Sequence, residues 1–187
     1  MKNTVLVLTI ALSATAFTAC NNAENSSNKM AEKENDQKFE NNDVKKDAEF
    51  AMKAASGGMM EVELGQWAAT NGASDGVRQF GQNMVTDHSK ANDELKALAQ
   101  AKSISLPAQP DNDMQKKIND LKEKKGADFD KAYVDMMVSD HKDDIDLFQK
   151  EADKGNDADV KSWAAGKIPV LQHHLQMIEE MQKSMKK

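Results

Sequence analysis

Cysteine, proline, glycine and aromatic residues are all scarce in this chain, which has one Cys, three Pro, nine Gly and 5% aromatic residues among its 187 positions. A single cysteine excludes an internal disulfide and a zinc site made only of cysteines. The shortage of glycine and aromatic residues disfavours β-barrels and β-sandwiches. The formal net charge of -6 argues against a nucleic-acid partner, because a phosphate-binding surface needs excess Lys and Arg. Abundant Lys, Glu, Asp, Ala and Met are instead typical of a helical protein.

The start of the chain has the three parts of a signal peptide. Lys2 is followed by an apolar run over residues 5–12 and then by small residues that lead to Ala19 and Cys20. The run is too short for a membrane-spanning helix and fits a secretory signal. Ala19 before Cys20 resembles the lipobox of bacterial lipoproteins. This resemblance implies that residues 1–19 are cleaved off as a lipoprotein signal peptide and that Cys20 carries a lipid that anchors the protein to a membrane. The alternative is ordinary secretion with a free cysteine.

Residues 20–42 are predicted to be the lipidated cysteine followed by a disordered tether. They are rich in Asn, Glu, Lys and Ser, with Met30 and Phe39 as isolated apolar residues. Such a segment cannot bury enough apolar surface to fold alone. Asn21 after the cysteine resembles lipoproteins that are sorted to the outer membrane. The expected location is therefore the bacterial cell envelope, on the outer membrane and facing the periplasm.

From residue 43 onward the apolar positions follow a helical period, which predicts one folded domain over 43–187. Helices are expected over 43–71, 75–102, 127–153 and 157–185, with Ser74 as the cap of the second. Two short turns and one connection of about 20 residues predict an all-α, ferritin-like four-helix bundle. Its two helical hairpins would be joined by one long crossover that contains a short helix.

Three of the four histidines lie on apolar helical seams. His88, His141 and His174 belong to three different predicted helices, and Glu61 lies on the small-residue stripe of the remaining one. At about 1.5 Å per residue, the four side chains fall at nearly one level of the bundle. Helical bundles build metal sites from such inward-facing groups. We therefore predict these four residues as metal ligands; the alternative is a set of core histidines that hydrogen-bond their neighbours.

Other side chains near the histidines are secondary ligand candidates. Met84 and Met137 each precede a histidine by four residues and share its helix face. Thioethers beside imidazoles suit copper, particularly Cu(I), but methionine also fills gaps in apolar cores. Asp144 and Glu63 are the secondary carboxylates. The candidate metals are copper, zinc and iron.

The residues beside the histidines are expected to point elsewhere. Asp87 and Asp140 directly precede His88 and His141, so they do not share the same helix face. They would be exposed or would orient a residue of a neighbouring helix. His173, about 100° round the helix from its neighbour, is expected to be exposed.

No constellation of catalytic residues is visible in the sequence. The Glu-x-x-His pairs of di-iron bundles are absent, because Val85, Val138 and Leu171 stand three residues before the seam histidines. Phosphate loops, dinucleotide fingerprints and nucleophile elbows are also missing. The leading hypothesis is an envelope lipoprotein that binds a metal ion or senses envelope conditions. A non-catalytic structural or interaction module is the alternative, and a metal-dependent oxidoreductase is the least supported function.

Four motifs occur in order along residues 45–182. They are GGMMEVELG over 57–65, the segment from Phe80 to His88, Phe129-Asp130-x-x-Tyr133 before His141, and Leu171-x-x-His174-Leu175. This succession resembles a bacterial family of exported ferritin-like proteins that is catalogued as a domain of unknown function. The resemblance implies the ferritin-like fold and an envelope location, but no established activity. The polar positions that match the family are Glu61, Asp87, His88, His141 and His174.

Overall fold

The computed structural model describes residues 23–40 and 42–185, which form six helices and no strand. The helices are α1 (Ala23–Lys38), α2 (Asn42–Asn71), α3 (Asp75–Ala101), α4 (Asn112–Lys122), α5 (Gly126–Lys154) and α6 (Ala158–Met185). No helix among these residues combines the length and apolar content needed to cross a bilayer. The predicted signal peptide and Cys20 lie outside the described residues. The all-α class predicted from composition and periodicity is confirmed.

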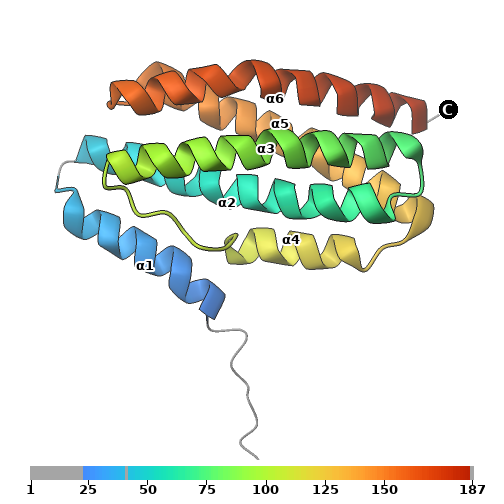
Figure 1. Ribbon diagram of the computed structural model, residues 1–187, viewed down its shortest axis with the longest axis horizontal. Helices are drawn as coiled ribbons and strands as arrows, with labels where there is room; N and C mark the ends of the chain where they lie inside the picture. Colours follow the sequence, from blue (N-terminus) through green and yellow to red (C-terminus); the bar gives the residue numbers. More distant parts are fainter. Residues whose placement is uncertain (1–22, 41, 186–187) are drawn as a thin grey trace, which may run out of the picture.

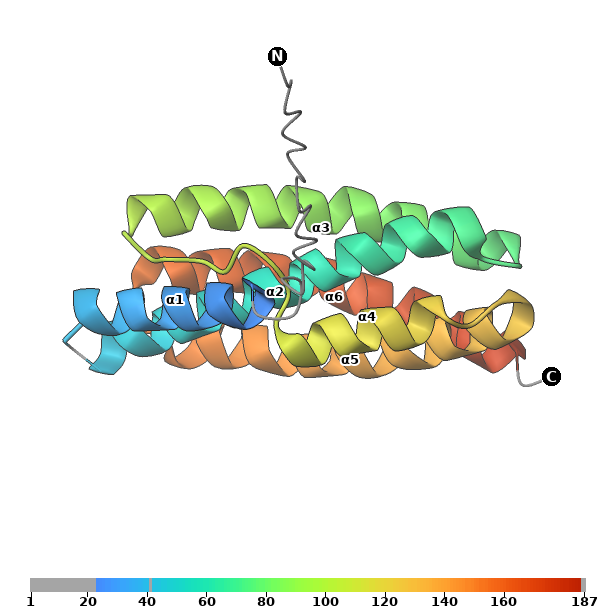
Figure 2. The ribbon, with the colours of Figure 1, turned by 90° about the horizontal axis from the view of Figure 1, so that it is seen from below.

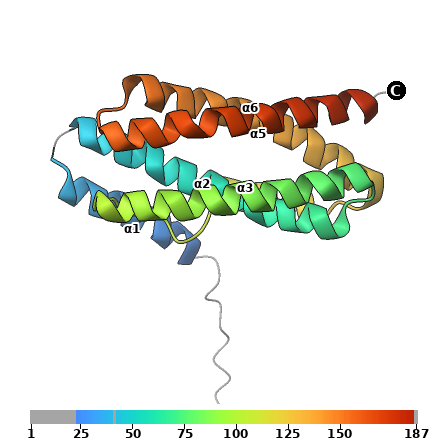
Figure 3. The same ribbon diagram turned by 45° about the horizontal axis from the view of Figure 1, so that its top comes forward.

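The four long helices run side by side along an elongated bundle (Figure 1). Helix α2 packs mainly against α3, and α5 packs mainly against α6. The two turns that join these pairs lie at opposite ends of the bundle, as Figures 1 and 3 show. Helix α4 packs on α2 and α5, and α1 packs on α2. Figure 2 shows α1 and α4 on the same side of the bundle. The observed bounds of the long helices lie within one residue of the predicted ones.

A carboxylate from another helix secures the turn at each end of the bundle. Asp130 of α5 accepts two backbone N–H hydrogen bonds from the α2–α3 turn, both at 2.8 Å. Ser74, the predicted cap of α3, accepts a hydrogen bond from the N–H of Val77. At the other end, Asp47 of α2 accepts backbone N–H hydrogen bonds from the α5–α6 turn. These contacts set the axial position of one helix pair relative to the other.

Helices α2 and α3 approach each other closely at two glycines. A Cβ atom at Gly81 would lie only 2.6 Å from the backbone oxygen of Gly65. Such a distance is too short for any side chain, so the close approach depends on glycine at this position. This packing brings the middle of α2, which carries Glu61, against the middle of α3.

Two apolar clusters fill the bundle, one toward each end. The cluster near the α2–α3 turn includes Phe80 and Tyr133, and the other cluster includes Leu95 and Phe148. Along α3 and α5, the histidines predicted as ligands fall between these two clusters in sequence and therefore along the helix axis. The centre of the bundle is thus a polar layer between apolar ones.

The disordered tether predicted for residues 20–42 is not what the structure shows, because residues 23–38 form α1. The crossover holds the helix in place, and these long-range contacts cannot be inferred from the composition of residues 20–42 alone. The side-chain amide of Asn35 donates to the backbone oxygen of Ser105 at 2.9 Å and accepts from its N–H at 2.7 Å. Ala31 is buried against the bundle, and Phe39 packs against one of the apolar clusters. Polar pairing with a distant loop therefore compensates for the low apolar content of this helix.

Candidate metal centre

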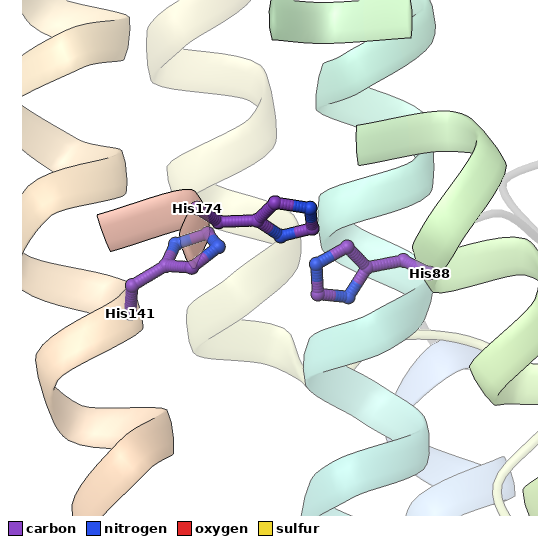
Figure 4. Close-up of side chains that lie close together, drawn as sticks. All are labelled: His88, His141 and His174. Atoms are coloured by element: carbon purple, nitrogen blue, oxygen red, sulfur yellow. The ribbon is translucent and has the colours of Figure 1, made fainter. Parts of the chain in front are cut away.

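Three histidine rings from three helices meet in the polar layer. Figure 4 shows His88 of α3, His141 of α5 and His174 of α6 directed toward one another. Their ring centroids are separated by 5.8 Å, 5.4 Å and 5.5 Å. The three residues are 6%, 0% and 1% exposed. One nitrogen from each ring lies within 4.8 Å of one nitrogen from each of the others.

The spacing of the rings is close to that of a tetrahedral metal centre. With metal–nitrogen bonds of about 2.0–2.1 Å, each imidazole centroid lies about 3.2 Å from the ion, and tetrahedral angles then separate the centroids by about 5.2 Å. The observed separations of 5.4–5.8 Å exceed that value only slightly. A small inward movement of the side chains would bring all three rings into coordination distance of one ion.

Each ring uses one nitrogen for a hydrogen bond and leaves the other without a partner. The contacts are His88 Nδ1 to Glu61 Oε2 at 2.6 Å, His141 Nδ1 to the backbone oxygen of Met137 at 3.0 Å, and His174 Nε2 to Asp87 Oδ2 at 2.8 Å. The remaining nitrogens, which are His88 Nε2, His141 Nε2 and His174 Nδ1, are buried and have no hydrogen-bond partner.

The hydrogen-bond partners determine which ring nitrogen is protonated. A backbone carbonyl can only accept, so His141 Nδ1 carries the proton and Nε2 presents a lone pair. At His88 and His174 the partner is a carboxyl group, which accepts from the ring in the same way when it is ionised. Histidines that ligate metals nearly always donate their other N–H to a carboxylate or a carbonyl, which orients the ring. The three imidazoles have this arrangement, with each bare nitrogen buried.

The buried environment keeps the rings neutral. Burial lowers the pKa of His88 to about 4, and burial together with the neighbouring imidazoles lowers the pKa of His141 to about 3. Burial also lowers the pKa of His174, although its bond to Asp87 opposes that shift. Neutral imidazoles are the form that binds a metal ion, so no proton has to be displaced at neutral pH.

A group of carboxylates adjoins the histidines. Glu61 of α2 is 2% exposed, and its Oε1 lies 3.7 Å from His141 Nε2. Asp140 and Asp144 of α5 each place an oxygen within 4.8 Å of one oxygen of Glu61 and of each other. Burial is the main cause that raises the pKa of Asp140 to about 6 and holds those of Glu61 and Asp144 well above their usual values. The centre therefore combines neutral nitrogen donors with carboxylates that are difficult to ionise without a cation.

The four residues predicted as ligands, which are Glu61, His88, His141 and His174, are brought together by the fold. Of the secondary candidates, Asp144 joins the carboxylate group. Glu63 instead forms an ion pair with Lys122 at the surface. Met84 and Met137 are fully buried in an apolar cluster. Metal coordination by any of these residues stays a prediction.

Of the two alternatives that the sequence left open for Asp87 and Asp140, exposure or contact with a neighbouring helix, the structure shows the second. Asp87 reaches from α3 to His174 on α6, and Asp140 joins the carboxylate group. Both directly precede a seam histidine in a Met-Val-(Thr/Ser)-Asp-His segment. The repetition of this segment was the sequence feature that could have marked both aspartates as candidate site residues. A side chain that lies 100° round the helix from the apolar seam does not face the bundle axis, but it can face a neighbouring helix.

Comparison with known proteins supplies one match. A family model described as "Domain of unknown function (DUF4142)" matches residues 22–181, which is most of the chain. No curated protein and no solved structure matches. The matched region contains all of the histidines and carboxylates of the centre.

Proposed function

The chain belongs to the family of domains of unknown function DUF4142, and from that premise we propose that it is a metal-binding helical domain. The ligands would be His88, His141 and His174, with Glu61 close enough to complete the coordination. The observation that carries this proposal is the set of three buried, unpartnered ring nitrogens that face a common point. A single ion would satisfy all three at once.

The main alternative is a structural module whose histidines are hydrogen-bonded core residues. A buried polar atom without a partner costs about 1–3 kcal/mol. Each of the three rings carries one such atom, so hydrogen bonding satisfies only half of their polar groups. Apolar side chains of similar size would fill this layer without that cost. The arrangement therefore favours a ligand over a purely structural role.

The donor set narrows the choice of metal. Imidazole nitrogens suit zinc, copper and iron, and three of them plus a carboxylate or water form a common four-coordinate site for zinc. Zinc is therefore the first ion to test, and copper and iron follow. Catalytic activity is not part of the proposal.

The architecture is proposed to be the ferritin-like bundle. The two helix pairs, α2–α3 and α5–α6, are joined by a crossover that carries α4, and the candidate centre lies midway along the four long helices. Ferritin-like folds have this connectivity and place their metal ligands at the same level. Helix α1 is an addition that packs on α2.

We further propose that Cys20 is lipidated and that the chain is held at the outer membrane of a bacterial envelope. The support is the sequence pattern before the described residues. Palmitate labelling of cells that express the full chain tests this. Labelling of the wild type that is lost in Cys20→Ser is expected, whereas an unlabelled wild type would refute it.

Metal analysis of the purified full-length protein tests the binding function. After treatment with a chelator, the protein is dialysed against zinc, copper or iron and its metal content is measured. We expect one tightly bound ion per chain and, for an ion present at 100 times its dissociation constant, a Tm that rises by about 5–10 °C. His174→Ala should lose the ion. A chain that binds none of the three metals would rule the proposal out.

The neighbouring histidine provides a matched control. His173 is exposed and lies on the same turn of α6 as His174. His173→Ala removes one imidazole from the protein but none from the centre, so its metal content should equal that of the wild type. Equal metal loss in both variants would indicate binding through surface histidines. Circular dichroism of both variants verifies that the helices remain.

A further inference from the structure

Among the described residues, the carboxylate group beside the histidines forms no ion pair with a lysine or an arginine, and Glu61 contacts only His88 and His141 in this way. Glu61, Asp140 and Asp144 place oxygens within 4.8 Å of one another in the interior of the bundle. The basic side chain that acts on Asp140 is Lys117 of α4, which is exposed, and its effect is smaller than that of burial. When these three clustered carboxylates are ionised, no ion-paired lysine or arginine balances their charge.

Unpartnered polar atoms point to a ligand in this group. Glu61 Oε1 and Asp140 Oδ2 are buried and accept no hydrogen bond. A separate observation comes from outside the group, because His141 Nε2 is fully buried, also lacks a partner, and lies 3.7 Å from Glu61 Oε1. When Glu61 is ionised, its Oε1 and the lone pair of His141 Nε2 repel each other at 3.7 Å. A bound cation removes that repulsion.

We propose that Glu61, Asp140 and Asp144 form a second cation site, specific for a hard divalent ion, and that Glu61 is shared between this site and the histidine site. The inference rests on the proposed function, in which the histidines bind the first ion. It goes further in assigning a second ion of different chemistry. Carboxylate oxygens prefer Mn²⁺, Mg²⁺ or Ca²⁺, whereas imidazoles prefer zinc or copper. The two donor sets therefore select unlike metals.

A cavity leads to the second site from the surface. It has a volume of about 120 Å³, and the residues that line it include Glu61, His88 and Asp144 as well as Lys90 and Lys167. Asp87, which is 45% exposed, also lines it. A space of this volume has room for a few water molecules, and hard divalent cations retain water among their ligands. The three carboxylates do not have to complete the coordination alone.

Manganese titration of the zinc-loaded, full-length protein tests the proposal. Free Mn²⁺ gives a strong electron paramagnetic resonance signal that is lost when the ion binds, so the bound fraction is measured directly. We expect one Mn²⁺ per chain in addition to one zinc. Asp140→Asn should weaken Mn²⁺ binding by roughly tenfold or more while leaving the zinc content unchanged, because it removes only an oxygen donor. Asp146→Asn, an exposed change on the same helix, is the control and should bind Mn²⁺ normally.

Each result has a defined consequence. Zinc binding without any Mn²⁺ binding, or equal Mn²⁺ affinity in Asp140→Asn and wild type, overturns the second site and leaves the histidine site standing. If none of zinc, copper and iron binds, the proposed function fails, and Mn²⁺ titration of the metal-free protein decides the carboxylate site separately. Asp144→Asn provides a second variant if Asp140→Asn does not fold. Glu61→Gln should weaken both ions, and an effect on only one would disprove sharing.

Discussion

Replacing Asp140 by Asn should stabilise the metal-free protein at alkaline pH. Burial is the largest cause that raises the pKa of Asp140 to about 6 from its usual 3.8. Above pH 6 the folded state therefore holds a carboxylate whose ionised form it disfavours. Asn is nearly the same size and carries no charge. The substitution removes the energetic cost of ionisation while keeping the packing of α5.

The size of the effect follows from the pKa difference. A shift of about two units corresponds to about 3 kcal/mol of destabilisation when the group is fully ionised, which applies above about pH 7. The folded state binds more protons than the unfolded state between the two pKa values, so this destabilisation decreases on acidification. Near pH 4.5 it is about 1 kcal/mol. An unpaired Asn amide costs about 1 kcal/mol at either pH. The free energy of unfolding of the variant, relative to that of wild type, should therefore be about 2 kcal/mol higher at pH 8 than at pH 4.5.

Urea unfolding at both pH values, with a chelator present, measures this difference. The free energy of unfolding of Asp140→Asn is compared with that of wild type and of Asp146→Asn, whose exposed side chain should change it by less than about 0.5 kcal/mol. A variant that is destabilised equally at both pH values would refute the reasoning. It would mean that Asp140 is ionised and adequately solvated in the folded protein, which removes the argument that the carboxylate group requires a cation.

Three further predictions concern the framework around the centre. Gly81→Ala should destabilise the fold by about 1–3 kcal/mol, because the added Cβ would clash with the α2 backbone. Gly166→Ala should stabilise the fold by about 0.5–1 kcal/mol, because the added Cβ has no atom within 4 Å and alanine favours the helix. Thermal unfolding of the two variants measures both effects. Burial and a neighbouring carboxylate raise the pKa of Glu151 to about 7, so Glu151→Gln should stabilise by about 1–2 kcal/mol near pH 8.5 and have little effect near pH 4.5, as measured by urea unfolding. Asn35→Ala breaks two hydrogen bonds to the crossover and should accelerate amide hydrogen exchange in α1 but not in α3. Unchanged exchange in α1 would show that apolar contacts hold this helix.

The candidate centre has the features expected of a site that sacrifices stability for binding. Its polar layer interrupts an otherwise apolar bundle, and several of its buried atoms have no partner. Residues that serve only the fold are seldom arranged in this way, because each unpaired atom lowers stability. Occupation by metal would restore that stability, and for this reason the predictions for metal-free and metal-loaded protein differ.

Local sequence pattern was sufficient to predict the long helices and the positions of the seam histidines. The helical period of the apolar residues reports which face of a helix is buried, and the turns at Ser74 and Gly155 mark where two of the helices begin and end. Because the rise per residue is constant, equal distances from a turn imply equal heights in the bundle. These relations depend on one helix or one hairpin at a time, so they are readable from the chain alone.

Contacts between distant segments were decided only by the tertiary structure. The pairing of Asp87 with His174, the inclusion of Asp140 in the carboxylate group and the support of α1 by Ser105 all join elements that are far apart in sequence. Each depends on how a helix is rotated about its axis and on which neighbour it faces. Packing of the whole bundle sets that rotation, and a polar side chain 100° from the apolar seam can then face either solvent or another helix. The sequence therefore determined the helices and the heights of the histidines, and packing determined their partners.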